Sequence, residues 1–373
     1  MKTPKNPFIL SGYYGKKWFC DRETEKEEIL NHLSNERNVV LYAWRRMGKT
    51  ALIKNIFEEL KENRKAETVY IDLLSTQTLP EAIRAITKAV YETFGKTSSG
   101  FSAAMRQLLS VIGVSIRFDP LTGVPDITLG INQPIVPEKS LEAIGDFLRG
   151  RKKQIIISLD EFQQVSDYAE KNAEAAFRHW MQEFPEIRFI YSGSHRGMME
   201  AMFTKKNRPF YKSAQLMAMG PIAPDAYSDF IQSHFSENGK RIKKEQIKEI
   251  YHWCRGQTYS IQLVCNYLFG RYENVENEHL SSVFKYILEQ ENAVFINFQK
   301  LLTINQWELL RAIGKAGEVT NPTSQHFVIG NNLGAASSVS RALQALVTKE
   351  LVIQENEKYM IHDIILSRWL AHL

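Results

Sequence analysis

Five short apolar segments in the first 220 residues constrain the fold of this chain more than any other feature. They are rich in β-forming residues, most are separated by helical patterns, and they run Val39 to Ala43, Thr68 to Leu73, Gln154 to Leu159, Arg188 to Ser192 and Gln215 to Met219. Strands that alternate with helices imply crossover connections and a mainly parallel sheet. Continuous hydrophobicity, as in Ile155-Ile156-Ile157, is typical of strands covered on both faces. The sequence therefore predicts an α/β fold.

The pattern changes twice along the 373 residues, and a chain of this length usually forms two or three domains. Residues 111 to 133 alternate apolar and polar side chains around Pro120-Leu121-Thr122-Gly123, which predicts a β-hairpin insert. From Pro224 onward the patterns are helical. Near the end, an amphipathic helix over Ser337 to Thr348 precedes two short apolar runs, as in a winged helix. We expect three domains: a sheet domain over 1–223, a helical domain over 224–300 and a winged helix over 301–373.

Composition excludes several classes of protein. With 44% apolar and 24% charged residues, the chain is neither disordered nor fibrous. We find no run of about 20 apolar residues and no signal peptide at the N-terminus, so we expect a cytoplasmic protein without membrane contact. Cys20, Cys254 and Cys265 are widely spaced and lack neighbouring ligands, which indicates neither a disulfide framework nor a zinc site.

The net charge of +5 is unevenly distributed. Residues 196 to 212 carry five basic side chains against Glu200, and residues 240 to 248 carry five against Glu245. Such clusters either face an anionic partner such as DNA or form ordinary solvated surfaces. The sequence leaves both interpretations open.

The stretch LYAWRRMGKTALIKNIF, residues 41 to 57, has the order of a phosphate-binding loop between a buried strand and a helix. Gly48 lets backbone N–H groups turn toward an anion, and the positive end of the helix lies behind them. Lys49 is expected to reach the β and γ phosphates, and the Thr50 hydroxyl to bind magnesium. Ala43 replaces the first glycine of the motif, which costs little if its backbone stays extended. The predicted nucleotide-binding residues of the loop are Arg45, Arg46, Met47, Gly48, Lys49, Thr50 and Ala51.

A second motif ends the strand Gln154 to Leu159 with Asp160 and Glu161, about 110 residues after Lys49. In phosphoryl transfer, Asp160 is suited to hold hydrated magnesium and Glu161 to polarise the attacking water. The alternative is a helix start with acidic residues in its first turn. Because parallel sheets bind ligands at the carboxyl ends of their strands, the two motifs together favour nucleotide binding.

A third element, SGSHRG, follows the strand Arg188 to Ser192. In P-loop ATPases with an extra strand between the two motifs, a polar residue here contacts the γ phosphate or the water, and Ser192 and Ser194 are the candidates. A plain glycine turn explains the stretch equally well. Arg196 and Arg208 are candidate arginine fingers, in this chain or toward a neighbour.

The ordered segments FCDRETE, RRMGKT, LDEFQQV, YSGSH and RPFY, followed by YMIHDIILSRWL, resemble the bacterial members of the archaeal-type ATPase family, of the STAND class of AAA+-like P-loop ATPases. The resemblance covers nearly the whole chain. It implies strand order 5-1-4-3-2, a helical lid, a terminal winged helix, and an adenine site near Phe19, Asp21, Arg22 and Glu23. Two departures stand out: Gly256-Gln257-Thr258-Tyr259 replaces a Gly-Gly-x-Pro turn, and Trp44 occupies a position where proline is common.

Three functions remain as hypotheses. The first is a slow ATPase that uses ATP or ADP with Mg²⁺ as a switch, in which ATP bound between sheet and lid positions the winged helix. The second is a DNA-associated ATPase of the initiator or transposition-helper kind, although the helix Ser337 to Thr348 carries only one basic residue, Arg341. The third is a non-catalytic, nucleotide-bound adaptor. A protein partner is expected, and oligomerisation stays open.

Overall fold

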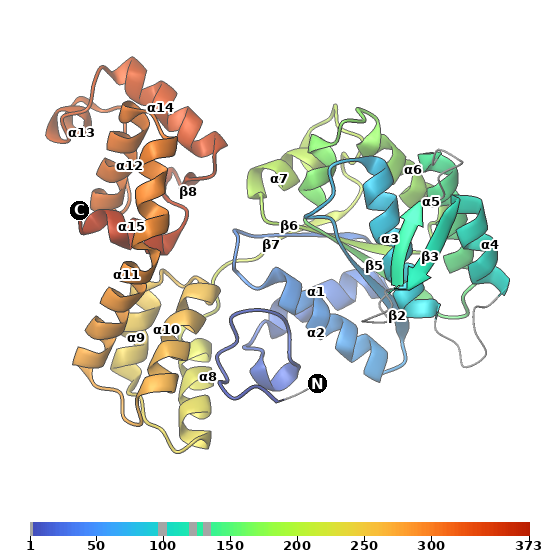
Figure 1. The fold of residues 1–373 in the computed structure, drawn as a ribbon, viewed down its shortest axis with the longest axis horizontal. Helices are drawn as coiled ribbons and strands as arrows, with labels where there is room; N and C mark the ends of the chain where they lie inside the picture. Colours follow the sequence, from blue (N-terminus) through green and yellow to red (C-terminus); the bar gives the residue numbers. More distant parts are fainter. Residues whose placement is uncertain (1–2, 96–102, 119–124, 130–135) are drawn as a thin grey trace. The chain divides into compact units, whose positions relative to one another are not determined.

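The computed structural model describes residues 3–95, 103–118, 125–129 and 136–373 (Figure 1). The chain divides into two compact units. One unit is Tyr13–Gly220, and the other combines Met1–Gly12 with Pro221–Leu373.

A five-stranded parallel sheet forms the centre of the unit Tyr13–Gly220. Its strands are β1 (Val39–Tyr42), β2 (Ala66–Asp72), β5 (Gln154–Asp160), β6 (Arg188–Gly193) and β7 (Gln215–Ala218). Their spatial order is β2-β5-β6-β1-β7. Numbered 1 to 5 along the chain, these strands lie in the order 2-3-4-1-5, which is the predicted 5-1-4-3-2 read from the opposite edge. The predicted fold and topology are therefore confirmed. All five apolar segments became strands, with ends shifted by at most two residues.

Helices cover both faces of this sheet (Figure 1). Alternation along β1 divides its side chains: Val39 and Leu41 pack with the first two helices, whereas Val40 and Tyr42 pack on the opposite side. The helices of this unit are α1 (Glu23–Ser34), α2 (Lys49–Glu62), α3 (Leu79–Phe94), α4 (Ala103–Ile112), α5 (Pro137–Arg149), α6 (Ala173–Glu183) and α7 (Arg196–Thr204), with short 3-10 turns η1 (Lys16–Trp18) and η2 (Phe162–Asp167). No helix of the described residues is long and apolar enough to cross a bilayer.

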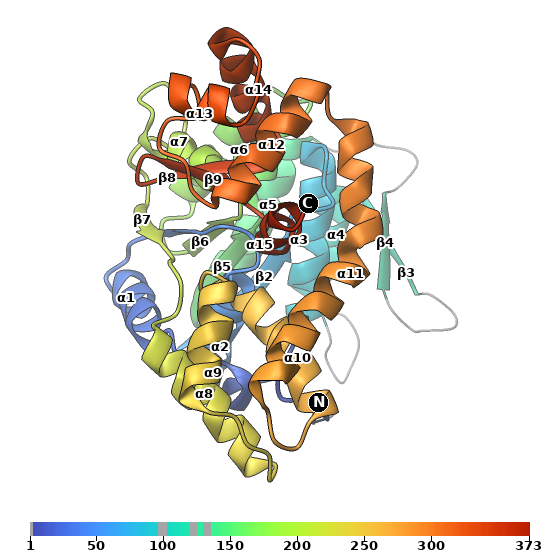
Figure 2. The ribbon, with the colours of Figure 1, turned by 90° about the vertical axis from the view of Figure 1, so that its left-hand side faces the viewer.

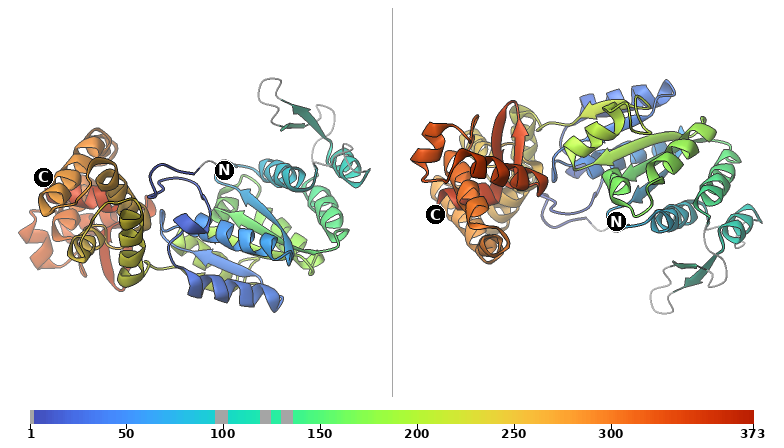
Figure 3. Two further views of the ribbon diagram at one scale, coloured as in Figure 1. Left: turned by 90° about the horizontal axis from the view of Figure 1, so that it is seen from below. Right: turned by 90° about the horizontal axis from the view of Figure 1, so that it is seen from above.

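The predicted hairpin is present as β3 (Val114–Phe118) and β4 (Pro125–Leu129), which pair antiparallel in a separate two-stranded sheet. Figure 3 shows this hairpin apart from the main sheet, next to α4. The predicted turn at residues 120–123 lies outside the described residues. The prediction was wrong at its start, because Val111 and Ile112 complete helix α4, where Ile112 is buried in the main core.

The second unit contains the helices that follow the sheet and the winged-helix segment (Figure 2). Its elements are α8 (Pro224–Glu237), α9 (Lys244–Trp253), α10 (Thr258–Arg271), α11 (Asn277–Leu301), α12 (Ile304–Ala316), α13 (Gln325–Gly330), α14 (Ala336–Thr348), β8 (Val352–Glu355), β9 (Lys358–Ile361) and α15 (Ile364–Ala371). Strands β8 and β9 pair antiparallel, and Val319 adds a bridge to Tyr359. The predicted helix–hairpin pattern of a winged helix is therefore present.

Two arginines join α15 to the last residues of α9 and to Arg255 just after it. Arg368 donates from Nε to the Trp253 carbonyl at 2.9 Å and from a terminal nitrogen to the His252 carbonyl at 3.1 Å. Arg255 donates to the Gly317 carbonyl at 3.2 Å and to the Ser367 hydroxyl at 3.1 Å. These contacts fix the end of the chain to the helices that precede the winged helix.

The N-terminal residues contribute to this second unit. Phe8 is 1% exposed and packs its ring 5.5 Å from that of Phe235 and 5.8 Å from that of Phe269. Asn6 donates to the Asn266 carbonyl at 2.9 Å, and Asn266 donates to the Phe8 carbonyl at 2.8 Å. This packing was not predictable from the sequence, since a lone phenylalanine carries no periodic pattern.

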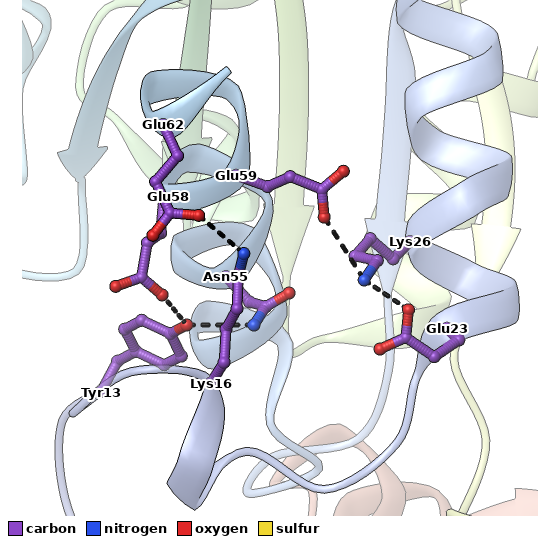
Figure 4. Close-up of polar contacts among 8 residues, drawn as sticks. All are labelled: Tyr13, Lys16, Glu23, Lys26, Asn55, Glu58, Glu59 and Glu62. Carbon is purple, nitrogen blue, oxygen red and sulfur yellow. Dashed lines mark hydrogen bonds and ion pairs between the residues drawn. The ribbon is translucent and has the colours of Figure 1, made fainter. Parts of the chain in front are cut away.

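The sheet unit begins at Tyr13, and the short stretch that carries Tyr13 and Lys16 lies along α2 (Figure 4). Tyr13 donates to Glu58 at 2.6 Å and accepts from Asn55 at 3.0 Å, while Lys16 pairs with Glu62 at 2.8 Å. On α1, Lys26 pairs with Glu23 and lies 3.4 Å from Glu59 of α2. These contacts brace α2, whose first residues belong to the phosphate-binding loop.

Candidate nucleotide-binding site

The predicted phosphate-binding loop connects the end of β1 to the start of α2. Gly48 has φ 94° and Arg46 has φ 67°, both in the left-handed region, so the loop turns sharply before the helix. Ala43 is buried and its φ is not positive, as required of an alanine in place of glycine. Lys49 is buried, and its Nζ donates to the Ala43 carbonyl at 3.2 Å. The lysine therefore lies inside the curve of the loop.

The carboxylate of Asp160 meets the loop at the carboxyl end of β5. Its Oδ2 accepts from the Thr50 hydroxyl at 2.7 Å, and its Oδ1 accepts from the Ser192 hydroxyl at 2.5 Å. Asp160 is 3% exposed, so this charge is stabilised by hydrogen-bond donors rather than by water. A hydroxyl and a carboxylate are hard oxygen ligands of the kind Mg²⁺ prefers, so the pair fits a magnesium ion.

Glu161 occupies a different environment from its neighbour. Its backbone is left-handed, with φ 54°, and its Oε2 accepts from the Ser194 hydroxyl at 2.7 Å, from the Ser194 backbone N–H at 3.3 Å and from the Gln163 amide. The intervening Gly193 has no room for a side chain, because a Cβ there would lie 2.3 Å from Gln163 Oε1. The two serines predicted to contact phosphate or water thus hold the two carboxylates.

Comparison with known proteins gives the family. A family model described as the ATPase domain predominantly from Archaea matches residues 19–264, well over half of the chain. The chain belongs to this ATPase family. A second model, a probable winged helix domain, matches residues 293–372.

Two curated relatives of this chain are uncharacterised ATP-binding proteins. One, from Pyrococcus horikoshii, is 26% identical over 155 residues, and the other, from Methanocaldococcus jannaschii, is 27% identical over 164 residues. Each match covers 40% of this chain and 44% of the relative. The chain therefore spans less than half of the length of these relatives.

Several solved structures share the fold of this chain. A Walker-type ATPase of Pyrococcus abyssi has a TM-score of 0.68 at 16% identity, covering 98% of this chain and 99% of that one. The Aeropyrum pernix ORC2 protein has a TM-score of 0.56 at 14% identity over 94% and 91% of the two chains. The Aeropyrum pernix ORC1 protein in complex with DNA has a TM-score of 0.52 at 13% identity over 95% and 93%. At these identities the likeness shows the fold alone.

The remaining residues of the predicted phosphate-binding loop differ in exposure. Arg45 and Arg46 are exposed, Met47 is buried, and Ala51 is half-buried in the first turn of α2. Arg22, which the resemblance assigned to the adenine side, is 4% exposed and has φ 72°. Its guanidinium donates to Glu25 at 2.6 Å, to the Gly220 carbonyl at 2.7 Å and to the Met47 carbonyl at 3.5 Å. Arg22 therefore binds the backbone of the loop at Met47.

The two candidate finger arginines have different partners. The guanidinium of Arg196 lies 5.8 Å from the ring centre of Tyr42 and 5.9 Å from that of Trp44, with Nε 3.4 Å from Glu200. Arg208 is bound to Glu174 and donates to the Ser166 hydroxyl at 2.6 Å. Of the two, Arg196 lies beside the phosphate-binding loop, whereas Arg208 binds η2 through Ser166 and α6 through Glu174.

Three polar residues of the candidate site were not predicted from the sequence: Tyr70, Asp72 and Gln163. Tyr70 donates to Asp160 Oδ2 at 2.5 Å. Asp72 pairs in register with Asp160, and partial burial raises its pKa, as do the charges of Asp160 and Glu161, against a hydrogen bond from the Leu74 N–H. The register of β2 against β5 brings Tyr70 and Asp72 to the site, and a single sequence does not display register.

Proposed function

We propose that this chain is a slow, Mg²⁺-dependent ATPase in which the bound nucleotide acts as a switch for the winged-helix domain. The observation that carries the proposal is the 2.7 Å hydrogen bond between Thr50 and Asp160, residues 110 positions apart. It brings the two motifs to one point, at the carboxyl edge of a parallel sheet where such folds bind ligands. The family and the ATP-binding relatives support the same conclusion.

Each residue then has a stated task. Backbone N–H groups from Arg45 to Ala51 and the start of α2 bind the phosphates, and Lys49 adds a positive charge. Thr50 and Asp160 hold Mg²⁺, which neutralises charge on the phosphates when bound. Glu161 accepts a proton from the attacking water, and Ser194 orients its carboxylate. Arg196 is the candidate for neutralising charge that develops on the γ phosphate.

A nucleotide titration followed by Trp44 fluorescence tests the proposal. Trp44 lies in the loop and is half-buried, so bound phosphates are expected to alter its emission. Wild type should bind ATP more tightly with Mg²⁺ than without it, and Lys49→Ala should lose binding. A Trp44→Phe variant, with binding measured by calorimetry, controls for the other five tryptophans. ATP binding by Lys49→Ala equal to that of wild type would remove the proposal.

A DNA-associated ATPase is the second candidate. One structure with this fold is an ORC1 protein in complex with DNA, and Lys205 and Lys206 are exposed after α7. The cluster at 240–248 favours it less, because Lys240, Lys243 and Lys244 each pair with an acidic side chain. The proposed switch includes two further points: the chain is a member of the STAND class, and it acts on a protein partner. Tightly held ADP without turnover would favour a non-catalytic adaptor over both.

A further inference from the structure

In the described part of the chain, four hydrogen bonds reach the Asp160 carboxylate. Oδ1 accepts from the Ser192 hydroxyl at 2.5 Å and from the Glu161 backbone N–H at 3.1 Å. Oδ2 accepts from the Thr50 hydroxyl at 2.7 Å and from the Tyr70 hydroxyl at 2.5 Å. A carboxylate has about four acceptor positions, so these donors fill it. If Thr50 turns to a cation, Tyr70 is the side-chain donor that remains on Oδ2.

The position of the Tyr70 hydroxyl is fixed from two sides. Strand pairing aligns Tyr70 with Ser158 and Asp72 with Asp160, so the tyrosine lies one pleat before the carboxylate, on the same face. Its ring packs partly against the core beneath α1 and α2, and Lys54 Nζ lies 5.0 Å from the ring centre. Lys54 follows Thr50 by one turn of α2, so α2 carries Thr50 and also contacts the tyrosine ring.

The two hydroxyl donors on Oδ2 come from different elements, because Tyr70 lies on β2 and Thr50 lies in the first turn of α2. No other hydroxyl among the described residues donates to Oδ2 besides those of Thr50 and Tyr70.

We propose that Tyr70 is a positioning residue for the divalent cation: its hydroxyl holds Oδ2 of Asp160 in the orientation in which Asp160 and Thr50 receive the metal. This inference rests on the proposed function. A carboxylate that loses an anchoring hydrogen bond samples more orientations, and loss of such outer-shell partners commonly lowers metal affinity by about 10–100-fold. In this proposal Tyr70 acts through Asp160 and makes no contact with the nucleotide.

The test compares Tyr70→Phe with wild type and with Tyr191→Phe. Tyr191 is a buried tyrosine of β6 whose ring packs among Phe162, Phe203 and Phe210, so its substitution removes the same atom from the same sheet. The probe is Mn²⁺, titrated by electron paramagnetic resonance in the presence of a non-hydrolysable ATP analogue. Metal-free analogue binding and the melting temperature without metal are measured in parallel.

We expect Tyr70→Phe to weaken Mn²⁺ binding by about tenfold or more, with metal-free analogue binding and melting temperature close to those of wild type. Tyr191→Phe should leave the Mn²⁺ affinity unchanged. Unchanged or tighter Mn²⁺ binding by Tyr70→Phe, with wild type showing metal-dependent binding, would overturn the inference and leave the proposed function standing. A wild type that binds no analogue at all would remove both.

Discussion

Asp160 and Glu161 are adjacent carboxylates with different surroundings. Asp160 is 3% exposed and accepts from Thr50, Tyr70 and Ser192, donors from three different strands and helices. Glu161 has a left-handed backbone and accepts from Ser194 and Gln163. The first carboxylate is held at the predicted phosphate-binding loop, and the second is held by the residue after β6 and by η2. This separation suits one to a metal and the other to a water molecule.

Glu161→Gln is expected to keep ATP binding and to stop hydrolysis. The amide can still accept from Ser194 but has no negative charge with which to take a proton. A steady-state phosphate-release assay should show a fall in turnover of about 10²-fold or more, with Kd little changed. Glu67→Gln is the matched control, because Glu67 lies on β2 and pairs with Arg151 near the surface. Normal turnover in Glu161→Gln would exclude this glutamate as the base.

At the scale of elements, α9 ends against α15. The last carbonyls of a helix have no partner within it, and Arg368 supplies donors to those of His252 and Trp253. Trp369, the next residue, donates from its indole N–H to Asn292 of α11 at 2.9 Å. Helix α15 therefore connects α9 and α11 within the C-terminal unit.

Arg368→Ala should destabilise the C-terminal unit. Hydrogen bonds from a charged donor contribute about 1.5–3 kcal/mol, so we expect the free energy of unfolding to fall by about that amount in a urea titration. Arg341→Ala provides the control, since Arg341 is exposed on α14 and should change stability by less than about 0.5 kcal/mol. Equal stability of Arg368→Ala and wild type would show that these hydrogen bonds add nothing to folding.

Elements were predictable to the extent that their pattern is local. The apolar runs gave β1, β5 and β6, and the spacing of Val339, Leu343 and Leu346 gave α14, because burial on a sheet or a helix face leaves a period in the sequence. The loop and Asp160 were predictable because the chemistry of phosphate binding restricts residue types. Tyr70 was not, because its role depends on the pairing of β2 with β5, which joins residues far apart in the chain.

At the scale of the molecule, charge bears on the DNA alternative. Lys205 and Lys206 are exposed, whereas Lys243 pairs with Glu276 and Lys244 with Asp229. If the chain binds duplex DNA through the first pair, neutralising both lysines should lower the salt-dependence slope of binding by about 2 in a fluorescence anisotropy titration.

The control for that experiment is the paired cluster, Lys243→Ala with Lys244→Ala. Those lysines already have acidic partners, so the slope should change less than with Lys205 and Lys206 neutralised. No measurable duplex binding at low salt would dismiss the DNA-associated function and leave the switch.

Phe8 has a practical consequence for dissecting this protein. The aromatic cavity among Phe235, Phe269 and His234 is filled by a side chain from the opposite end of the chain. A fragment that begins at residue 221 would lack Phe8 and would expose the rings of Phe235 and Phe269 to water. Adding residues 3–12 to this fragment, by fusion or as a separate peptide, should restore the packing of Phe8 and stabilise the isolated unit.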